Sequence, residues 1–233
     1  MINEEINNRL KNLFVLHNDV AEKCITAYDG AFYALDLLAL SVINRSYNLL
    51  DGFIELINKK NIIAAAPLIR MQLDNVLRFS AAFYVEDPHS FSLKVLEGIP
   101  IRNIDSIENK KMTDRYLVEK LVKTQQKKWI KKVYNNTSGY VHFSEKHIYS
   151  TFQLNKNKNG EFNVFIGPIG KNTKDPLLLE AIECFIECTK MLMTYIEGWI
   201  FTKDNPEKVQ EIRKNIINKT GKEPEIIFSD ITQ

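Results

Sequence analysis

The sequence is poor in residues that cross-link a chain, form phosphate-binding loops or separate domains. Its 233 residues include three cysteines, seven prolines and nine glycines. Three cysteines cannot build a disulfide framework, and no glycine-rich phosphate loop, H-E-x-x-H or G-x-S-x-G motif is present. No stretch rich in proline, glycine or serine marks a linker. The common catalytic signatures are therefore excluded, and we expect neither a metal nor a cofactor.

Long apolar segments are also absent. No run reaches the roughly 18 apolar residues that suggest a membrane-spanning helix, and the longest, residues 31–43, is interrupted by Asp36 and Ser41. The polar, acidic residues 1–9 lack the layout of a signal peptide. We therefore expect a cytoplasmic protein that does not engage a membrane.

Helical periodicity is the main pattern that is present. Apolar residues recur at spacings of three and four, as on the buried face of an α-helix. Asp175–Pro176 and Asn205–Pro206 add helix-start signals, and Ser90 and Thr113 are candidate caps. The expected helices cover about residues 3–27, 31–58, 62–85, 90–98, 113–122, 125–146, a stretch of about seven turns from residue 175, and 206–219.

The periodicity changes after residue 147. Residues 148–154 and 161–166 favour strands and flank a turn-rich segment, so we expect a β-hairpin at about residues 148–167. The predicted fold is predominantly α: a helical bundle of five to six substantial helices with one β-hairpin insertion. It forms a single domain over residues 1–221, followed by a C-terminal tail at 222–233.

Charge is distributed unevenly along the chain. Residues 108–158 carry 12 basic and 4 acidic residues, a net charge of +8, whereas the segment on each side carries −3. A basic block of this kind is the expected footprint of RNA or another polyanion. The alternative is a solvated, lysine-rich helix face that binds nothing. The candidate ligand-binding lysines are Lys127, Lys128, Lys131 and Lys132.

A row of hydrogen-bonding residues follows the basic block. Tyr134, Ser138 and His142 are spaced four apart, which places them near one face of a continuous helix. In a catalytic reading, His142 acts as a general base or acid and Tyr134 donates to an oxyanion, with Ser138 as the small hydroxyl between them. In the structural alternative, Gly139 admits a close neighbour and His142 is a hydrogen-bonded core imidazole.

Charged residues also interrupt the apolar third helix. Arg70, Asp74 and Arg78 are four apart, which on a surface would be a charge ladder worth a few tenths of a kcal/mol per pair. A buried arginine instead needs a partner, because an unpaired buried charge is costly. Arg45 and Asp36 raise the same question in the second helix. Our hypothesis is that the following residues converge in one interior cleft: Arg45, Arg70, Asp74 and His142.

These two motifs, Ala66-Pro-Leu-Ile-Arg70 with Asp74 and Tyr134-x-x-x-Ser138-x-x-x-His142, carry a family resemblance. Over about residues 31–146 the chain resembles the HEPN-like helical domains of bacteria, including uncharacterised relatives. HEPN ribonucleases usually carry an arginine four to six residues before the histidine, but residues 135–138 are Asn, Asn, Thr and Ser here. Either Arg70 supplies the positive charge or the site binds without cutting.

The resemblance implies metal-independent RNA cleavage. His142 would move the 2′-hydroxyl proton, and Arg70 would stabilise the charged phosphorus centre. Three functions remain open: a binding or regulatory module without catalysis, which we place first; an RNase-like toxin or phage-defence effector; and a small-anion or nucleotide sensor in which Arg45 and Arg70 clamp the ligand. A protein partner and a homo-oligomer, most simply a dimer, are compatible with all three.

Overall fold

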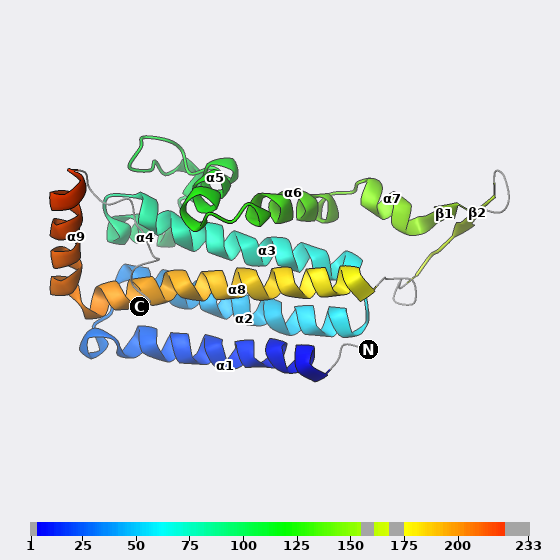
Figure 1. The fold of residues 1–233 in the computed structure, drawn as a ribbon, viewed down its shortest axis with the longest axis horizontal. Coiled ribbons are helices and arrows are strands. Elements are labelled where there is room, and N and C mark those ends of the chain that lie inside the picture. Colours follow the sequence, from blue (N-terminus) through cyan, green and yellow to red (C-terminus); the bar gives the residue numbers. More distant parts are fainter. Residues whose placement is uncertain (1–3, 155–160, 168–174, 222–233) are drawn as a thin grey trace.

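The computed structural model describes residues 4–154, 161–167 and 175–221. It is predominantly helical, as predicted. Four long helices lie side by side along the long axis of the molecule (Figure 1), namely α1 Glu4–Thr26, α2 Ala34–Asn58, α3 Ile62–Ser80 and α8 Asp175–Asp204. In the described residues no helix has both the length and the apolar content needed to cross a membrane.

Shorter elements surround these four helices. α5 and α6 pack over α3, α9 lies across one end of the bundle, and α7 extends beyond the opposite end (Figure 1). Their bounds are α4 Pro88–Leu96, α5 Asp114–Gln125, α6 Trp129–Val141, α7 Glu145–Thr151 and α9 Pro206–Thr220, with short 3-10 segments η1 Tyr28–Gly30, η2 Ala81–Tyr84 and η3 Ile101–Asn103.

Capping side chains set the starts of α4 and α5. The Thr113 hydroxyl accepts a hydrogen bond from the backbone N–H of Tyr116, so the predicted cap of α5 is confirmed. The predicted cap of α4 is wrong: Asp87, not Ser90, receives the backbone N–H of His89 at 2.9 Å, and α4 begins at Pro88. Asp is as good a cap as Ser, and proline is favoured at the first helical position.

The predicted helix at 125–146 is divided in the structure. The division lies at residues 142–144, because α6 ends at Val141 and α7 begins at Glu145, while the predicted break before this helix is present at Gln126, whose left-handed backbone (φ 53°) ends α5. Beyond α6, residues 148–151 belong to α7 rather than to a strand. The Ser150 and Thr151 hydroxyls both donate to the His147 carbonyl, at 2.7 and 2.9 Å, and these local bonds accompany the helical backbone.

Two short strands follow α7. β1 Phe152–Leu154 pairs antiparallel with β2 Phe162–Val164, with Phe152 opposite Val164. The loop predicted between them, residues 155–160, lies outside the described residues, as does the predicted tail at 222–233. Together with α7, the strands form the part of the molecule that projects beyond the end of the bundle (Figure 1).

The core joins α2, α3 and α8. The Phe53 and Phe185 rings stack at 4.2 Å between centroids, and Leu50, Leu73 and Leu77 are fully buried around them. Burying each such side chain contributes about 1.5–3 kcal/mol relative to leaving it exposed. This apolar seam holds the three helices together along most of their length.

A buried ion pair closes one end of the bundle. Lys203 near the end of α8 and Asp36 in the first turn of α2 are both fully buried, with Nζ and Oδ2 3.1 Å apart. The carboxylate also accepts from the Trp199 indole at 2.8 Å and from the backbone N–H of Tyr33 at 2.8 Å. Lys203 in turn donates to the backbone carbonyl of Cys24 at 3.0 Å, so three helix ends meet at this pair.

Replacing Lys203 by Met tests this pair. The substitution leaves the Asp36 carboxylate buried without its counter-charge, so we expect the free energy of unfolding in urea to fall by about 3–5 kcal/mol. The matched control is Lys23→Met, which removes an exposed lysine 4.0 Å from Glu197; it should change stability by less than about 0.5 kcal/mol. Equal effects of the two substitutions would contradict a structural role for the buried pair.

Candidate functional site

Three helices bring charged and aromatic side chains to one cluster. Arg70 and Arg78 of α3 both donate to Asp114, the first residue of α5; the Arg70 Nη2 to Asp114 Oδ2 distance is 3.1 Å. The hydroxyl of Tyr134 on α6 donates to the same Asp114 oxygen at 3.3 Å. The Arg70 guanidinium also lies over the Tyr134 ring, 4.0 Å from its centroid. We call these four residues with Asp74 the arginine cluster.

The sequence builds this cluster from two local patterns. The four-residue spacing of Arg70, Asp74 and Arg78 puts them on one face of α3, and Arg78 Nε donates to Asp74 at 3.0 Å. The Thr113 cap places the Asp114 carboxylate in the first turn of α5, where the helix dipole favours a negative charge. α3 therefore presents two guanidiniums to the carboxylate that begins α5.

These contacts determine the protonation states of Asp114 and Arg78. Burial by itself would raise the pKa of Asp114, but the charge and hydrogen bond of Arg78, followed by those of Arg70 and Tyr134, hold that pKa below its usual range. Burial would lower the pKa of Arg78, and Asp74 and Asp114 overcome it and raise that pKa. Near neutral pH Asp114 is therefore a carboxylate and Arg78 a guanidinium cation.

Arg45 extends the cluster toward the interior. Its Nη1 donates to Asp74 Oδ2 at 3.2 Å and also to the side-chain oxygen of Asn75. Asn75 is buried and donates to Gln72 Oε1 at 3.1 Å. The charged cluster is thus continuous with a neutral hydrogen-bond network inside the bundle.

The neutral network ends at a buried histidine. Gln72 donates to the Ser46 hydroxyl at 2.6 Å, and Ser46 lies 2.7 Å from His17 Nε2. His17 Nδ1 lies 2.6 Å from the backbone carbonyl of Leu13, which can only accept, so Nδ1 carries the proton and Nε2 accepts from Ser46. Burial lowers the pKa of His17, which keeps this imidazole neutral. The network is a satisfied structural feature rather than a source of protons.

The predicted anion clamp is not assembled. Arg45 and Arg70 bind different carboxylates, Asp74 and Asp114, rather than facing each other across an open pocket. Only 13% of the Arg70 side chain is exposed. Both arginines therefore hold helices together, which is the role that a partly buried guanidinium with a carboxylate partner usually has.

His142 does not join the arginine cluster as predicted. α6 ends at Val141, and His142 has an extended backbone (φ −105°, ψ 147°), so it leaves the helical stripe of Tyr134 and Ser138. It is exposed and lies about 12 Å along the helix axis from Tyr134. The Ser138 hydroxyl donates to the backbone carbonyl of Tyr134 at 2.8 Å instead of bonding to the imidazole.

The lysines of the basic block lie at the start of α6, with Lys127 and Lys128 just before the helix and Lys131 in its first turn. Lys127, Lys128 and Lys131 are exposed, and no described residue forms an ion pair with them. Lys132 differs, because its Nζ lies 3.8 Å from Glu180 of α8. No acidic residue occurs between positions 120 and 144. We call Lys127, Lys128 and Lys131 the lysine ridge.

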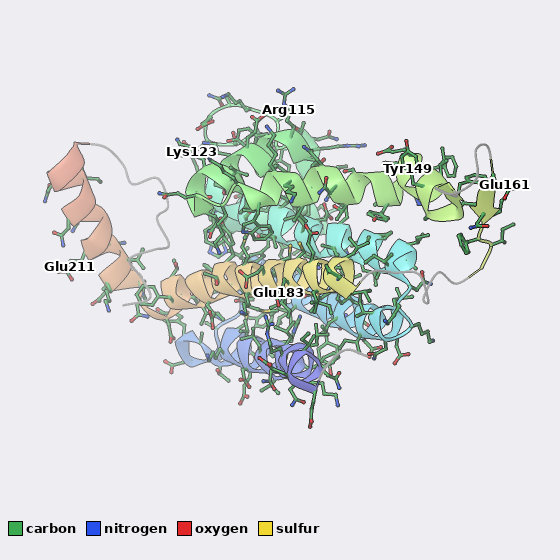
Figure 2. The ribbon with its side chains drawn as sticks, turned by 45° about the vertical axis from the view of Figure 1, so that its right-hand side comes forward. Arg115, Lys123, Tyr149, Glu161, Glu183 and Glu211 are labelled. Atoms are coloured by element: carbon green, nitrogen blue, oxygen red, sulfur yellow. The ribbon has the colours of Figure 1, made fainter. Side chains whose placement is uncertain are left out.

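Exposed aromatic residues follow the far end of α6. Phe143 is 83% exposed and Tyr149 is 76% exposed. The His147 ring stacks on Phe143, with 5.6 Å between centroids and 15° between planes. Figure 2 shows Tyr149 projecting from the layer that also carries Lys123, on the side of the molecule away from α1. Both aromatic side chains are therefore largely exposed to solvent, although His147 covers one face of Phe143.

Sequence reasoning missed Asp114 and Tyr149 as candidate residues. Two arginines on an apolar helix require a second carboxylate besides Asp74. The acidic residue directly after the predicted cap Thr113 was a signal for it. Tyr149 was assigned to a strand, and nothing local marked it as exposed. In the part of the chain that the structure describes, no group of three or more His, Cys, Asp or Glu side chains could hold a metal ion.

Comparison with known proteins adds no family assignment, because no family model, no curated protein and no solved structure matches the chain. The geometry of the chain itself therefore has to support any functional conclusion.

Replacing Asp114 by Asn tests the arginine cluster. Its depressed pKa means that Asp114 contributes stability above its unfolded pKa of about 3.9, and that this contribution is lost as the pH falls through the lower folded pKa. We expect the variant to be less stable at pH 7 by about 1–2 kcal/mol, a figure reduced because the carboxylate is about a third exposed.

The stability difference between parent and Asp114→Asn should shrink as the pH falls below about 3.9 and through the lower folded pKa of Asp114. Urea unfolding across this range measures it. Glu119→Gln, on the same helix and paired with the exposed Arg115, is the control and should change stability little at any pH. A difference between parent and Asp114→Asn that is the same at acid and neutral pH would contradict the ion-pair role.

Proposed function

We propose that this protein is a HEPN-like helical module that binds single-stranded RNA without cleaving it. The observation that carries the proposal is the exposed lysine ridge at the start of α6, together with the exposed rings of Phe143 and Tyr149 after its end. Basic side chains followed by exposed aromatic rings are the combination that single-stranded nucleic-acid binding uses.

Electrostatics supports attraction of a polyanion. From Asp114 to Val141 the chain carries seven basic and two acidic residues, a net charge of +5. Asp114 is already held by two arginines, and Glu119 pairs with Arg115. The positive charge of the lysine ridge is therefore left to neutralise phosphates, with release of counterions.

The aromatic residues support binding of unpaired bases. An exposed aromatic ring gives little to the core, whereas each base stacked on such a ring contributes about 1–3 kcal/mol. Stacking accepts any base, so the preference expected is for single strands rather than for a sequence. Duplex RNA keeps its bases stacked on each other and cannot use Phe143 or Tyr149 in this way.

The arginine cluster supports binding over cleavage. RNA cleavage of the kind that the HEPN resemblance implies needs a histidine and an arginine at one phosphate. His142 lies beyond the end of α6, and Arg70 is held by Asp114 and Tyr134. The RNase-like toxin and the anion sensor are therefore the weaker candidates, while a protein partner and self-association stay predictions of the sequence.

A lysine-ridge variant provides the first test. With a fluorescent oligouridine of about 12 nucleotides, Lys127→Gln/Lys128→Gln/Lys131→Gln should bind at least about tenfold more weakly than the parent. The slope of log affinity against log salt, measured by anisotropy from about 50 to 200 mM NaCl, should become shallower by about 2, because each phosphate contact on a single strand adds about 0.7.

The matched control removes three exposed lysines elsewhere, Lys59→Gln/Lys94→Gln/Lys208→Gln, with the same change in net charge. It should bind within about twofold of the parent. Equal weakening by both variants, or a parent that does not bind oligouridine at micromolar concentration, would overturn the proposal. RNA cleavage by the parent that disappears in His142→Ala would overturn its non-catalytic part.

An aromatic variant separates stacking from charge. Phe143→Ala and Tyr149→Ala should each weaken oligouridine binding by about 1–3 kcal/mol while leaving the salt slope unchanged, because stacking releases no counterions. The control is Tyr28→Ala, because Tyr28 is an exposed aromatic residue elsewhere on the molecule. Phe14 is unsuitable because it packs against the core. If Tyr28→Ala has the same effect as the other two, Phe143 and Tyr149 are not a stacking platform.

A further inference from the structure

A second surface of α6 borders a hollow that the proposed function does not use. The hollow has a volume of about 330 Å³ and lies between α3, α6 and α8. No residue of the lysine ridge lines it. Its apolar wall includes Ile62, Ala66 and Ile69 of α3, Val133 of α6, and Leu177 and Ala181 of α8.

Carboxylates line the α8 side of the hollow. Glu180, Glu183 and Glu187 are spaced three and four apart and all border it. Only Glu183 is firmly paired, because Arg9 donates to both of its oxygens, at 2.6 and 2.8 Å. Of the basic side chains, Lys132 borders the hollow. The lining therefore carries three negative charges and one positive charge.

The two other carboxylates are weakly neutralised. Lys132 Nζ lies 3.8 Å from Glu180, and both side chains are more than half exposed. Lys190 Nζ lies 3.4 Å from Glu187, and these two side chains are 55% and 40% exposed. Exposed pairs of this kind contribute little and are screened by salt. A cation that enters the hollow can therefore compete for Glu180 and Glu187.

Neighbouring titratable groups respond to the same field. Burial, followed by the charge of Glu180, raises the pKa of Tyr140. Burial and Glu180 also raise the pKa of Cys184 to about 11, with the charge of Lys132 acting in the opposite direction. Both side chains border the hollow, so its interior is apolar and its electrostatic field disfavours a further negative charge.

The dimensions fit a small molecule. Small-molecule sites typically measure about 300–1,000 Å³ and combine an apolar lining with a few polar groups that fix orientation. A hollow of 330 Å³ is at the lower end of that range. It can take a short hydrocarbon or single-ring body with one charged head group.

We propose that the hollow between α3, α6 and α8 binds a small amphipathic cation, with its apolar body against Ala66, Ile69 and Ala181 and its amine at Glu180 and Glu187. Burial of the body supplies the non-directional part of the affinity, at about 25 cal/mol per Å² of apolar surface. The carboxylates supply the preference for a positive head group. This site is independent of the lysine ridge and of RNA.

Three probes with one hydrocarbon chain and different head groups test the proposal on the full chain: octylamine, octanol and octanoate. Trp129 borders the hollow, so its fluorescence reports occupancy, and Trp129→Phe identifies the signal against the buried Trp199. At pH 7 and low salt we expect saturable binding in the order octylammonium, octanol, octanoate, with at least a tenfold difference between the first and the last.

Replacing the two carboxylates should abolish the order of affinities for the three probes but leave the hollow able to bind an apolar chain. In Glu180→Gln/Glu187→Gln, octanol should bind within about twofold of its parent affinity, and octylammonium should lose most of its advantage. The control Glu197→Gln/Glu211→Gln changes two exposed carboxylates elsewhere and should keep the parent order.

Three results would overturn the proposal. The first is no saturable change of Trp129 fluorescence with any probe below its aggregation concentration. The second is equal affinity for the three head groups in the parent. The third is a cation preference that survives in Glu180→Gln/Glu187→Gln or disappears in the control, either of which would locate the charge selectivity outside the hollow.

Discussion

The pairing of two partly buried guanidiniums with Asp114 is the interaction on which the arrangement of the outer helices depends. Arg70 and Arg78 are carried by α3, a helix that packs against α2 and α8 in the core. Two buried charges without a carboxylate would be unfavourable. Asp114 and Tyr134 satisfy them, and in doing so they fix α5 and α6 against α3.

Fixing α6 in this way decides what its two sides can do. The side with Tyr134 and Val133 faces α3, and the exposed lysine ridge lies at the start of the helix. The intermediate surface toward α8 borders the hollow and meets carboxylates rather than lysines. One helix thus carries the lysine ridge at its start and borders a hollow lined by weakly paired carboxylates, and the two regions suit ligands of opposite charge.

The fold could be predicted largely from local signals, because helix periodicity and capping act over a few residues. Thr113 is an example, since its hydroxyl caps α5 as expected. The errors arose where an equally good local alternative existed or where a single residue changed the backbone. Asp87 rather than Ser90 caps α4, and the extended backbone of His142 ends α6 within a stretch that reads as one helix.

The candidate site was less predictable because its contacts join distant parts of the chain. The need of Arg70 for a partner follows from the sequence, but its partner Asp114 is 44 residues away and was not identified. The spacing of Tyr134, Ser138 and His142 implies one stripe only while the helix continues, and α6 ends one residue too early. Exposure of Phe143 and Tyr149 depends on how the end of the molecule projects, which periodicity does not encode.

Mapping where RNA lies on the protein is the most direct measurement of the central claim, that the orientation of α6 presents an RNA-binding surface. Ultraviolet cross-linking of an oligouridine to the full chain, followed by mass spectrometry of the peptides, gives this map. The account predicts adducts within residues 127–149, concentrated at Phe143 and Tyr149. Adducts concentrated on α1 or α9 instead, or cross-linking that is no greater than with a chain unfolded in urea, would contradict it.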